Sequence, residues 1–388
     1  MIIPELLLFL LPVAAAAGWF AASRSHTSKA SANWDHSRRF HEDLGQLLSE
    51  KEADKQLFNS FTHANRDVAE TYVALGNLYR RRGEFDRAIR IHQSLFEKQD
   101  LDAESRALAR FELANDYVAA GLSDQAEATF TELINSQLKR SMSYAALLQL
   151  YEQQGEWMQA ARLAMQCQQD TGESLVRQVA HYYCELANQA RESGDTSQSQ
   201  RLLEVALEHP AHCARANVLL ADMALAEKDY QVAIRHCDTV EKLAPELMPV
   251  VIEQKFAALK GAADKAALKQ YVQKIQTRKN AYSVIRTTRT VVAEMVDEVT
   301  ADRFFKEQIL KRPSLRGLRD WAHDQLALSK PDERDKVKVI CNLLDQVMED
   351  KPSFRCSSCG FQGNIMHWRC PGCASWDTVS TIIGVEGE

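Results

Sequence analysis

TYVALGNLYRRRGEFDRAIRIHQSLFEKQD occupies residues 71–100 and contains a pattern that returns along the chain. The position of Gly76 recurs at residues 114, 148, 187 and 221, at spacings of 38, 34, 39 and 34 residues. A period of this length is typical of a repeat array, because each unit buries its apolar face only by stacking on its neighbours. The pattern therefore predicts a stack of similar helical units.

Three positions of the repeat have a clear physical role. A small residue such as Gly76 lets two antiparallel helices approach closely. A glycine after the first helix, such as Gly83, accepts the left-handed conformation that ends a helix. A small residue in the second helix packs against the first: Ala88, Ala126, Ala160 and Ala233. With these features the pattern resembles the tetratricopeptide repeat, whose period is 34 residues.

The resemblance predicts an all-α fold, a right-handed superhelix over residues 35–350. The clearest repeats cover residues 69–102, 107–140, 141–174, 180–213 and 214–247. Degenerate repeats are expected at residues 35–68 and 282–315, the second marked by Ala301, Phe305 and Pro313. Residues 248–281 and 316–350 have a helical pattern without the signature, which is common near the ends of such arrays.

Stacked repeats form a concave groove lined by their first helices, and such grooves bind extended peptides or protein partners. A plain spacer is the alternative. The candidate partner-binding residues face the groove by their repeat position: Val73, Asn77, Arg80, Phe111, Asn115, Val118, His181, Asn188 and Arg191. The three asparagines share one position, where an amide can bond both a donor and an acceptor of a bound backbone. The basic run from Arg80 to Arg82 is interpreted as a solvated face.

The end of the chain carries two Cys-x-x-Cys pairs, Cys356-Ser-Ser-Cys359 and Cys370-Pro-Gly-Cys373. Two such pairs at this separation predict one tetrahedral metal site. Four thiolates suit zinc or iron and no hard cation. Because four protein ligands leave no open position for water or substrate, the site is predicted to be structural.

Residues 354–388 form a predicted metal-binding domain, which is too short to bury a competent core. Metal binding must therefore supply much of its folding free energy. Four aromatic residues can surround the thiolates and offer a contact surface: Phe354, Phe361, Trp368 and Trp376. The turns resemble rubredoxin knuckles, and a zinc ribbon would look similar. Rubredoxins have a longer gap between the pairs, which argues against electron transfer. The aromatic residues and the short connection to the array favour packing of this domain on the repeats.

The amino-terminal stretch from Ile2 to Ala22 reads IIPELLLFLLPVAAAAGWFAA and holds one charged residue, Glu5. About 20 residues cross a bilayer core as a helix, so residues 1–22 are predicted to be a transmembrane anchor and residues 23–34 a linker. A cleaved signal peptide is the alternative, but no basic residue precedes Arg24. Basic residues after the segment place the bulk of the chain in the cytoplasm.

Bulk properties exclude several classes of function. A net charge of −6 gives no argument for nucleic acid. The five cysteines outside the terminal pairs (Cys167, Cys184, Cys213, Cys237 and Cys341) are odd in number, which suits a reducing compartment better than a disulfide scaffold.

Candidates for other chemistry are weak. Cysteines near His181, His212 and His236 are interpreted as small packing residues rather than a second metal site. The sequence has no Walker motif, H-E-x-x-H, G-x-S-x-G or dinucleotide fingerprint. It is therefore predicted not to be an enzyme.

Local stretches and the order of anchor, repeats and metal-binding domain resemble the lipopolysaccharide assembly protein B family. The similar stretches are LLLFLLPVAAA (6–16), LGNL (75–78), RAIRIHQ (87–93), HYYCELA (181–187) and RCSSCGF (355–361). The resemblance spans nearly the full length and is weakest over residues 248–350.

The resemblance implies a single-pass protein of the inner membrane with its bulk in the cytoplasm. It implies an adaptor that couples the deacetylase LpxC to the membrane AAA+ protease FtsH and so limits lipopolysaccharide synthesis. Other lipopolysaccharide synthesis or transport proteins are further expected partners. It also implies that Cys356, Cys359, Cys370 and Cys373 hold one iron ion, with zinc as the alternative.

Two other functions remain open at this point. One is a scaffold that gathers lipopolysaccharide-synthesis enzymes at the membrane without controlling proteolysis. The other is a redox protein that uses the four-cysteine site. Whether the array forms a homodimer is also open.

Overall fold

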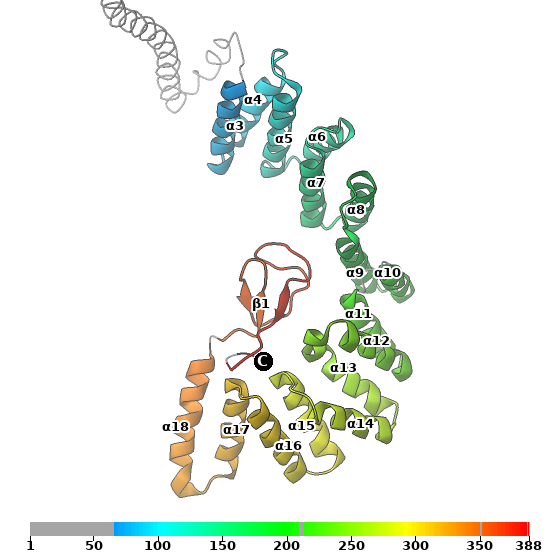
Figure 1. Ribbon diagram of the computed structural model, residues 1–388, viewed down its shortest axis with the longest axis vertical. Coiled ribbons are helices and arrows are strands. Elements are labelled where there is room, and N and C mark those ends of the chain that lie inside the picture. Colours follow the sequence, from blue (N-terminus) through cyan, green and yellow to red (C-terminus); the bar gives the residue numbers. More distant parts are fainter. Residues whose placement is uncertain (1–65, 209–212, 350, 386, 388) are drawn as a thin grey trace, which may run out of the picture. The chain divides into compact units, whose positions relative to one another are not determined.

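A computed structural model describes residues 66–208, 213–349, 351–385 and 387 (Figure 1). The predicted anchor over residues 1–22, the linker over residues 23–34 and nearly all of the degenerate repeat over residues 35–68 lie outside the described residues. Among the residues that are described, no helix is both long and apolar enough to cross a bilayer. The chain divides into two compact units between Ser143 and Tyr144, within one helix.

Successive helices form pairs joined by short turns, and a small sheet follows them. The pairs are α3 (Arg66–Arg81) with α4 (Phe85–Phe96), α5 (Ala103–Ala119) with α6 (Ser123–Asn135), α7 (Arg140–Gln154) with α8 (Trp157–Thr171), α9 (Val176–Glu192) with α10 (Thr196–Glu208), α11 (Ala214–Ala226) with α12 (Tyr230–Leu243), α13 (Met248–Gly261) with α14 (Lys265–Gln276), α15 (Tyr282–Met295) with α16 (Glu298–Lys311), and α17 (Leu315–Leu328) with α18 (Pro331–Met348). A 3-10 turn, η1 (Pro245–Leu247), precedes α13.

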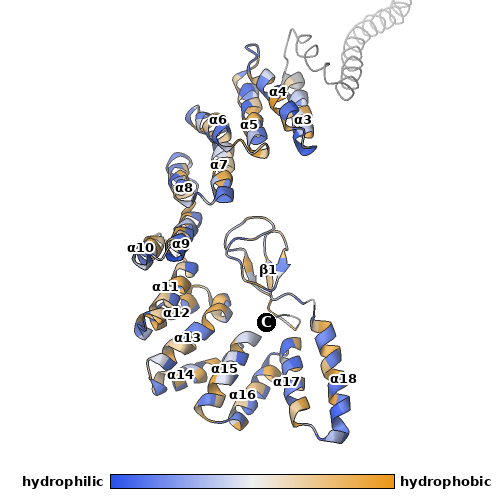
Figure 2. Ribbon diagram, turned by 180° about the vertical axis from the view of Figure 1, so that it is seen from behind, coloured by the Kyte–Doolittle hydropathy of each residue, from blue (hydrophilic) through white to orange (hydrophobic). Residues whose placement is uncertain are grey.

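Each of the five clear repeats contains one helix pair, from α3–α4 to α11–α12. Residues 248–281 and 282–315 also form helix pairs, and α17–α18 ends the array. The helices carry hydrophobic and hydrophilic residues on different faces (Figure 2), which is what helices in a stack need in order to bury one side.

The small residues of the repeat lie where the helices meet. A Cβ atom added at Gly76 would come within 2.4 Å of Nε2 of the fully buried His92, so α3 and α4 approach closely only with glycine there. The small residues of the second helices all have an exposed fraction of 0%: Ala88, Ala126, Ala160 and Ala233. Both predicted packing roles are confirmed.

The turn after each first helix uses the left-handed conformation. Glycine provides it, with φ between 73° and 87°, in four pairs: Gly83, Gly121, Gly155 and Gly194. After α11 and α13 the same conformation falls on Lys228, with φ of 63°, and on Ala263, with φ of 54°. A side chain there costs roughly 1–2 kcal/mol relative to the right-handed form.

In the first unit, buried charges join three helices. Arg80 donates to Asp116 at 2.7 Å and to Glu112 at 2.6 Å, and His92 Nδ1 lies 2.5 Å from the second carboxylate oxygen of Asp116. The interpretation of the basic run as a solvated face is therefore wrong for Arg80, because neighbouring carboxylates bind it. Arg81 and Arg82 are exposed, as expected.

The carboxy-terminal domain contains a sheet of β1 (Phe354–Cys356), β2 (Gln362–Gly363) and β3 (Val379–Thr381) in the order β2-β1-β3. Both pairings are antiparallel, with Phe354 opposite Gly363 and Cys356 opposite Val379. The first cysteine pair begins at the last residue of β1 and the second precedes β3, so the sheet brings the two pairs to one end of the domain.

Candidate metal centre and its contact with the repeats

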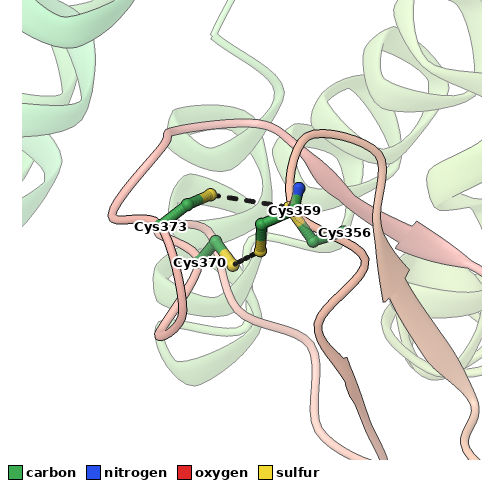
Figure 3. A group of neighbouring side chains, drawn as sticks. All are labelled: Cys356, Cys359, Cys370 and Cys373. Atoms are coloured by element: carbon green, nitrogen blue, oxygen red, sulfur yellow. Dashed lines mark hydrogen bonds between the residues drawn. The ribbon is translucent and has the colours of Figure 1, made fainter.

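The four cysteine thiols lie close together (Figure 3). All four sulfur atoms lie within 4.8 Å of one another, with Cys356 Sγ 3.8 Å from Cys373 Sγ and Cys359 Sγ 3.6 Å from Cys370 Sγ. Metal–sulfur bonds of about 2.3 Å in a tetrahedron separate the sulfurs by about 3.8 Å. The thiols therefore fit one tetrahedral ion, zinc or iron. No other group of three or more metal-ligating side chains occurs among the residues that the structure describes.

Local turns aim hydrogen-bond donors at the sulfurs. The backbone N–H groups of Ser358 and Cys359 donate to Cys356 Sγ at 3.4 and 3.5 Å, and Thr378 Oγ1 lies 3.3 Å from the same sulfur. The Thr378 contact and the Cys359 amide lower the pKa of Cys356 to about 6. Hydrogen bonding with Ser375 lowers the pKa of Cys373. A lowered pKa favours the thiolate, which is the form that binds a metal ion.

A glycine also relieves close packing at the second cysteine pair. A Cβ atom at Gly372 would lie 3.3 Å from Cys359 Sγ. Phe354, Phe361 and Met366 pack around the buried Cys356 and Cys370. The predicted apolar shell is confirmed for the two phenylalanines.

The metal-binding domain contacts the repeats through Trp376. Its indole stacks on the imidazole of His181 in α9, with 4.7 Å between ring centroids and 15° between ring planes. His181 has an exposed fraction of 1%, and its Nε2 lies 2.8 Å from a carboxylate oxygen of Asp377. The guanidinium of Arg215 in α11 lies 6.0 Å from the indole centroid. Trp376 is therefore held between first helices of two repeats.

Glu152 in α7 binds the same domain. Its carboxylate accepts a hydrogen bond from Trp376 Nε1 at 3.0 Å and another from Arg369 at 2.6 Å. Tyr182 of α9 donates to the same carboxylate at 2.6 Å. Burial, and then the Glu152 charge, raise the pKa of Tyr182 far above its usual value, so the phenol keeps the proton that it donates. One carboxylate thus joins two repeats to the metal-binding domain.

Further contacts extend along the array. Met366 and Trp368 pack against a buried cluster of the fifth and sixth helix pairs that includes Val218 and Val251. Thr381 Oγ1 donates to the carbonyl of Glu246 at 3.0 Å. At the end of the array, the N–H of Leu315 donates to the carbonyl of Val385 at 2.7 Å. The predicted packing of the metal-binding domain on the repeats is confirmed.

The predicted partner-binding residues have different surroundings. Val73 and Phe111 are buried in the core of the first unit, where Phe111 packs against Phe130. Arg80 is ion-paired, and His181 is covered by the metal-binding domain. The remaining candidates keep some exposure on their first helices: Asn77, Asn115, Val118, Asn188 and Arg191. Partner binding by this set stays a prediction.

Two residues of the contact were absent from that prediction, although repeat register points to both. Glu152 lies four residues after the Leu148 position, as Arg191 lies four after Ala187. Arg215 lies six residues before Ala221, as His181 lies six before Ala187. On the metal-binding domain, nothing in the sequence marks Arg369 as the partner of Glu152 or Asp377 as the partner of His181.

Comparisons with known proteins found matches to both the repeat array and the metal-binding domain. A family model described as a rubredoxin metal binding domain matches residues 354–380, and one described as a tetratricopeptide repeat matches residues 71–106. Lipopolysaccharide assembly protein B of Escherichia coli is 30% identical over 389 residues, which cover 99% of each chain. The protein of the same name from Haemophilus influenzae is 26% identical and covers 98% of this chain and 99% of its own length. This chain belongs to the lipopolysaccharide assembly protein B family.

Proposed function

We propose that this protein is a non-enzymatic adaptor at the inner membrane, with its bulk on the cytoplasmic side. It couples the deacetylase LpxC to proteolysis by the membrane protease FtsH and thereby limits lipopolysaccharide synthesis. The repeat array supplies the binding surfaces, and the segment over residues 1–22 supplies the membrane anchor.

The observation that carries this proposal is that the first helices of the repeats bind another folded domain. Glu152 and His181 hold a folded domain through a stacked indole and charge-assisted hydrogen bonds. Tyrosine, tryptophan and arginine contacts of this kind dominate protein–protein interfaces. The four-thiolate site leaves no open ligand position, which supports a structural role for the metal. The name of the family supports a place in lipopolysaccharide assembly.

We propose iron as the ion in the four-cysteine site, as the family resemblance implies. The sulfur geometry suits either metal, so elemental analysis of the protein purified from its native host distinguishes them. One equivalent of iron supports the proposal, and one equivalent of zinc with normal function contradicts it and also removes the basis for a redox role.

The half-life of LpxC in cells tests the adaptor function. Cells without this protein should retain LpxC several-fold longer than cells with it. A chain lacking residues 1–22 should behave like the deletion, because LpxC is then no longer brought to the membrane protease. An unchanged half-life in both strains, with synthesis enzymes still co-purifying with the protein, would instead identify a scaffold without control of proteolysis.

A further inference from the structure

Two adjoining cavities lie on the array beyond the metal-binding domain. One has a volume of about 520 Å³ and is lined by α13, α15 and α17; the other has about 570 Å³ and reaches α18. Both are lined by Arg286, Thr290 and Arg319, so the two cavities adjoin. Helices α13, α15 and α17 are first helices of their pairs, like α7, α9 and α11 that hold the metal-binding domain.

The smaller cavity, here named the basic cavity, has an excess of positive charge. Its charged lining residues are Glu253, Lys260, Arg286, Arg316 and Arg319, which are four cations and one carboxylate. Its lining also includes Phe256 and Val291, whose side chains are almost fully buried. A cavity with this charge attracts carboxylates.

Two of the four cations have unused donors. Arg286 is exposed and has no carboxylate partner among the residues that the structure describes. Arg316 donates to the carbonyl of Lys351 at 3.0 Å, while its buried Nε atom has no hydrogen-bond partner. The other two are paired, Lys260 with Glu294 and Arg319 with Asp320. Arg286 and Arg316 are thus the groups available to a ligand.

The neighbouring cavity lacks this excess. Its lining has three arginines, two of them shared with the basic cavity, and the three carboxylates of Asp320, Asp324 and Asp345. Arg289 there donates to Asp302 at 2.6 Å and lies 3.5 Å from Asp324. The groups that attract an anion are therefore Arg286 and Arg316 of the basic cavity. The neighbouring cavity adjoins it and reaches α18.

We propose that the basic cavity binds an acidic, extended segment of a protein partner. The two adjoining cavities are lined by residues from α13 to α18, which suits an extended segment better than a compact lipid headgroup. Arginine binds carboxylates through paired N–H groups, so Asp or Glu side chains of the partner meet Arg286 and Arg316. This inference rests on the proposed adaptor function and assigns it a binding surface.

Selection from a random decapeptide library on the full-length protein in nonionic detergent tests the inference. The selected peptides should be rich in Asp and Glu. Binding of such a peptide, measured by fluorescence anisotropy at low salt, should weaken about tenfold in Arg286→Glu. Arg286→Lys keeps the positive charge but loses the paired N–H groups, so it should weaken binding less than Arg286→Glu does. Arg278→Glu is the matched control, since it makes the same charge change at an exposed arginine outside both cavities, and it should weaken binding less than twofold.

Three outcomes would overturn the inference: peptides without an acidic excess, equal losses in Arg286→Glu and Arg278→Glu, or displacement of the peptide by millimolar glycerol 3-phosphate. The last would identify a lipid-headgroup site. The result is separable from the proposed function. If peptide binding fails these tests while LpxC half-life still depends on the protein, only the assigned surface is wrong.

Discussion

At the scale of single residues, Glu152 is the junction between the array and the metal-binding domain. It accepts hydrogen bonds from Tyr182 of the next repeat and from Arg369 and Trp376. These two residues of the metal-binding domain are 217 and 224 positions away in the chain. The cysteine ligands could be predicted because their spacing is local. The Glu152 contacts could not, because no local pattern encodes a pairing over such a separation.

Replacement of Glu152 by glutamine should loosen this contact by about 2 kcal/mol, because Arg369 keeps its charge and loses its carboxylate. Hydrogen exchange of residues 366–381, measured by mass spectrometry, should become faster. Glu156→Gln makes the same charge change at an exposed position of the same repeat and should leave the exchange unaltered. Equal effects of the two variants would show that Glu152 does not hold the domain.

At the scale of elements, the helix pairs follow from short-range rules. A small residue sets the distance between helices, and a left-handed residue ends the first helix. The sequence therefore predicts the pairs from α3 to α12 with their approximate bounds. Residues 248–281 lack the signature, and Ala263 stands where most repeats have the turn glycine, yet the buried faces of α13 and α14 still fold as a pair. Packing here outweighs the local cost of the turn.

The free-energy cost of the left-handed turn can be measured by substituting the adjacent residues Ala262 and Ala263. Ala263→Gly should raise the free energy of unfolding by about 0.5–1 kcal/mol. Glycine relieves the left-handed strain, and this gain exceeds the additional backbone entropy that glycine loses on folding. Ala262→Gly, at a residue with φ of −67°, should lower it by about the same amount. Urea unfolding followed by circular dichroism checks both. Destabilisation by Ala263→Gly would contradict this account of the turn.

At the scale of the whole molecule, a domain folded by a metal ion lies against the first helices of the array. The order of repeats and metal-binding domain could be read from the sequence, and the aromatic residues indicated that the two would pack. The docking position could not be read, since it depends on which first helices come together once the repeats are stacked. The metal is thereby linked to the binding face of the array, because Trp376 and Asp377 lie close to Cys373 and cover His181.

Hydrogen exchange of α9 with and without the metal site tests this linkage. In the double variant Cys356→Ser and Cys359→Ser, residues 354–381 should lose protection because the domain needs the metal to fold. The helix α9 around His181 should also exchange faster, while α14, whose residues make none of the contacts described for the domain, should not change. An unfolded metal-binding domain with unaltered protection of α9 would contradict the docking of this domain on the repeats.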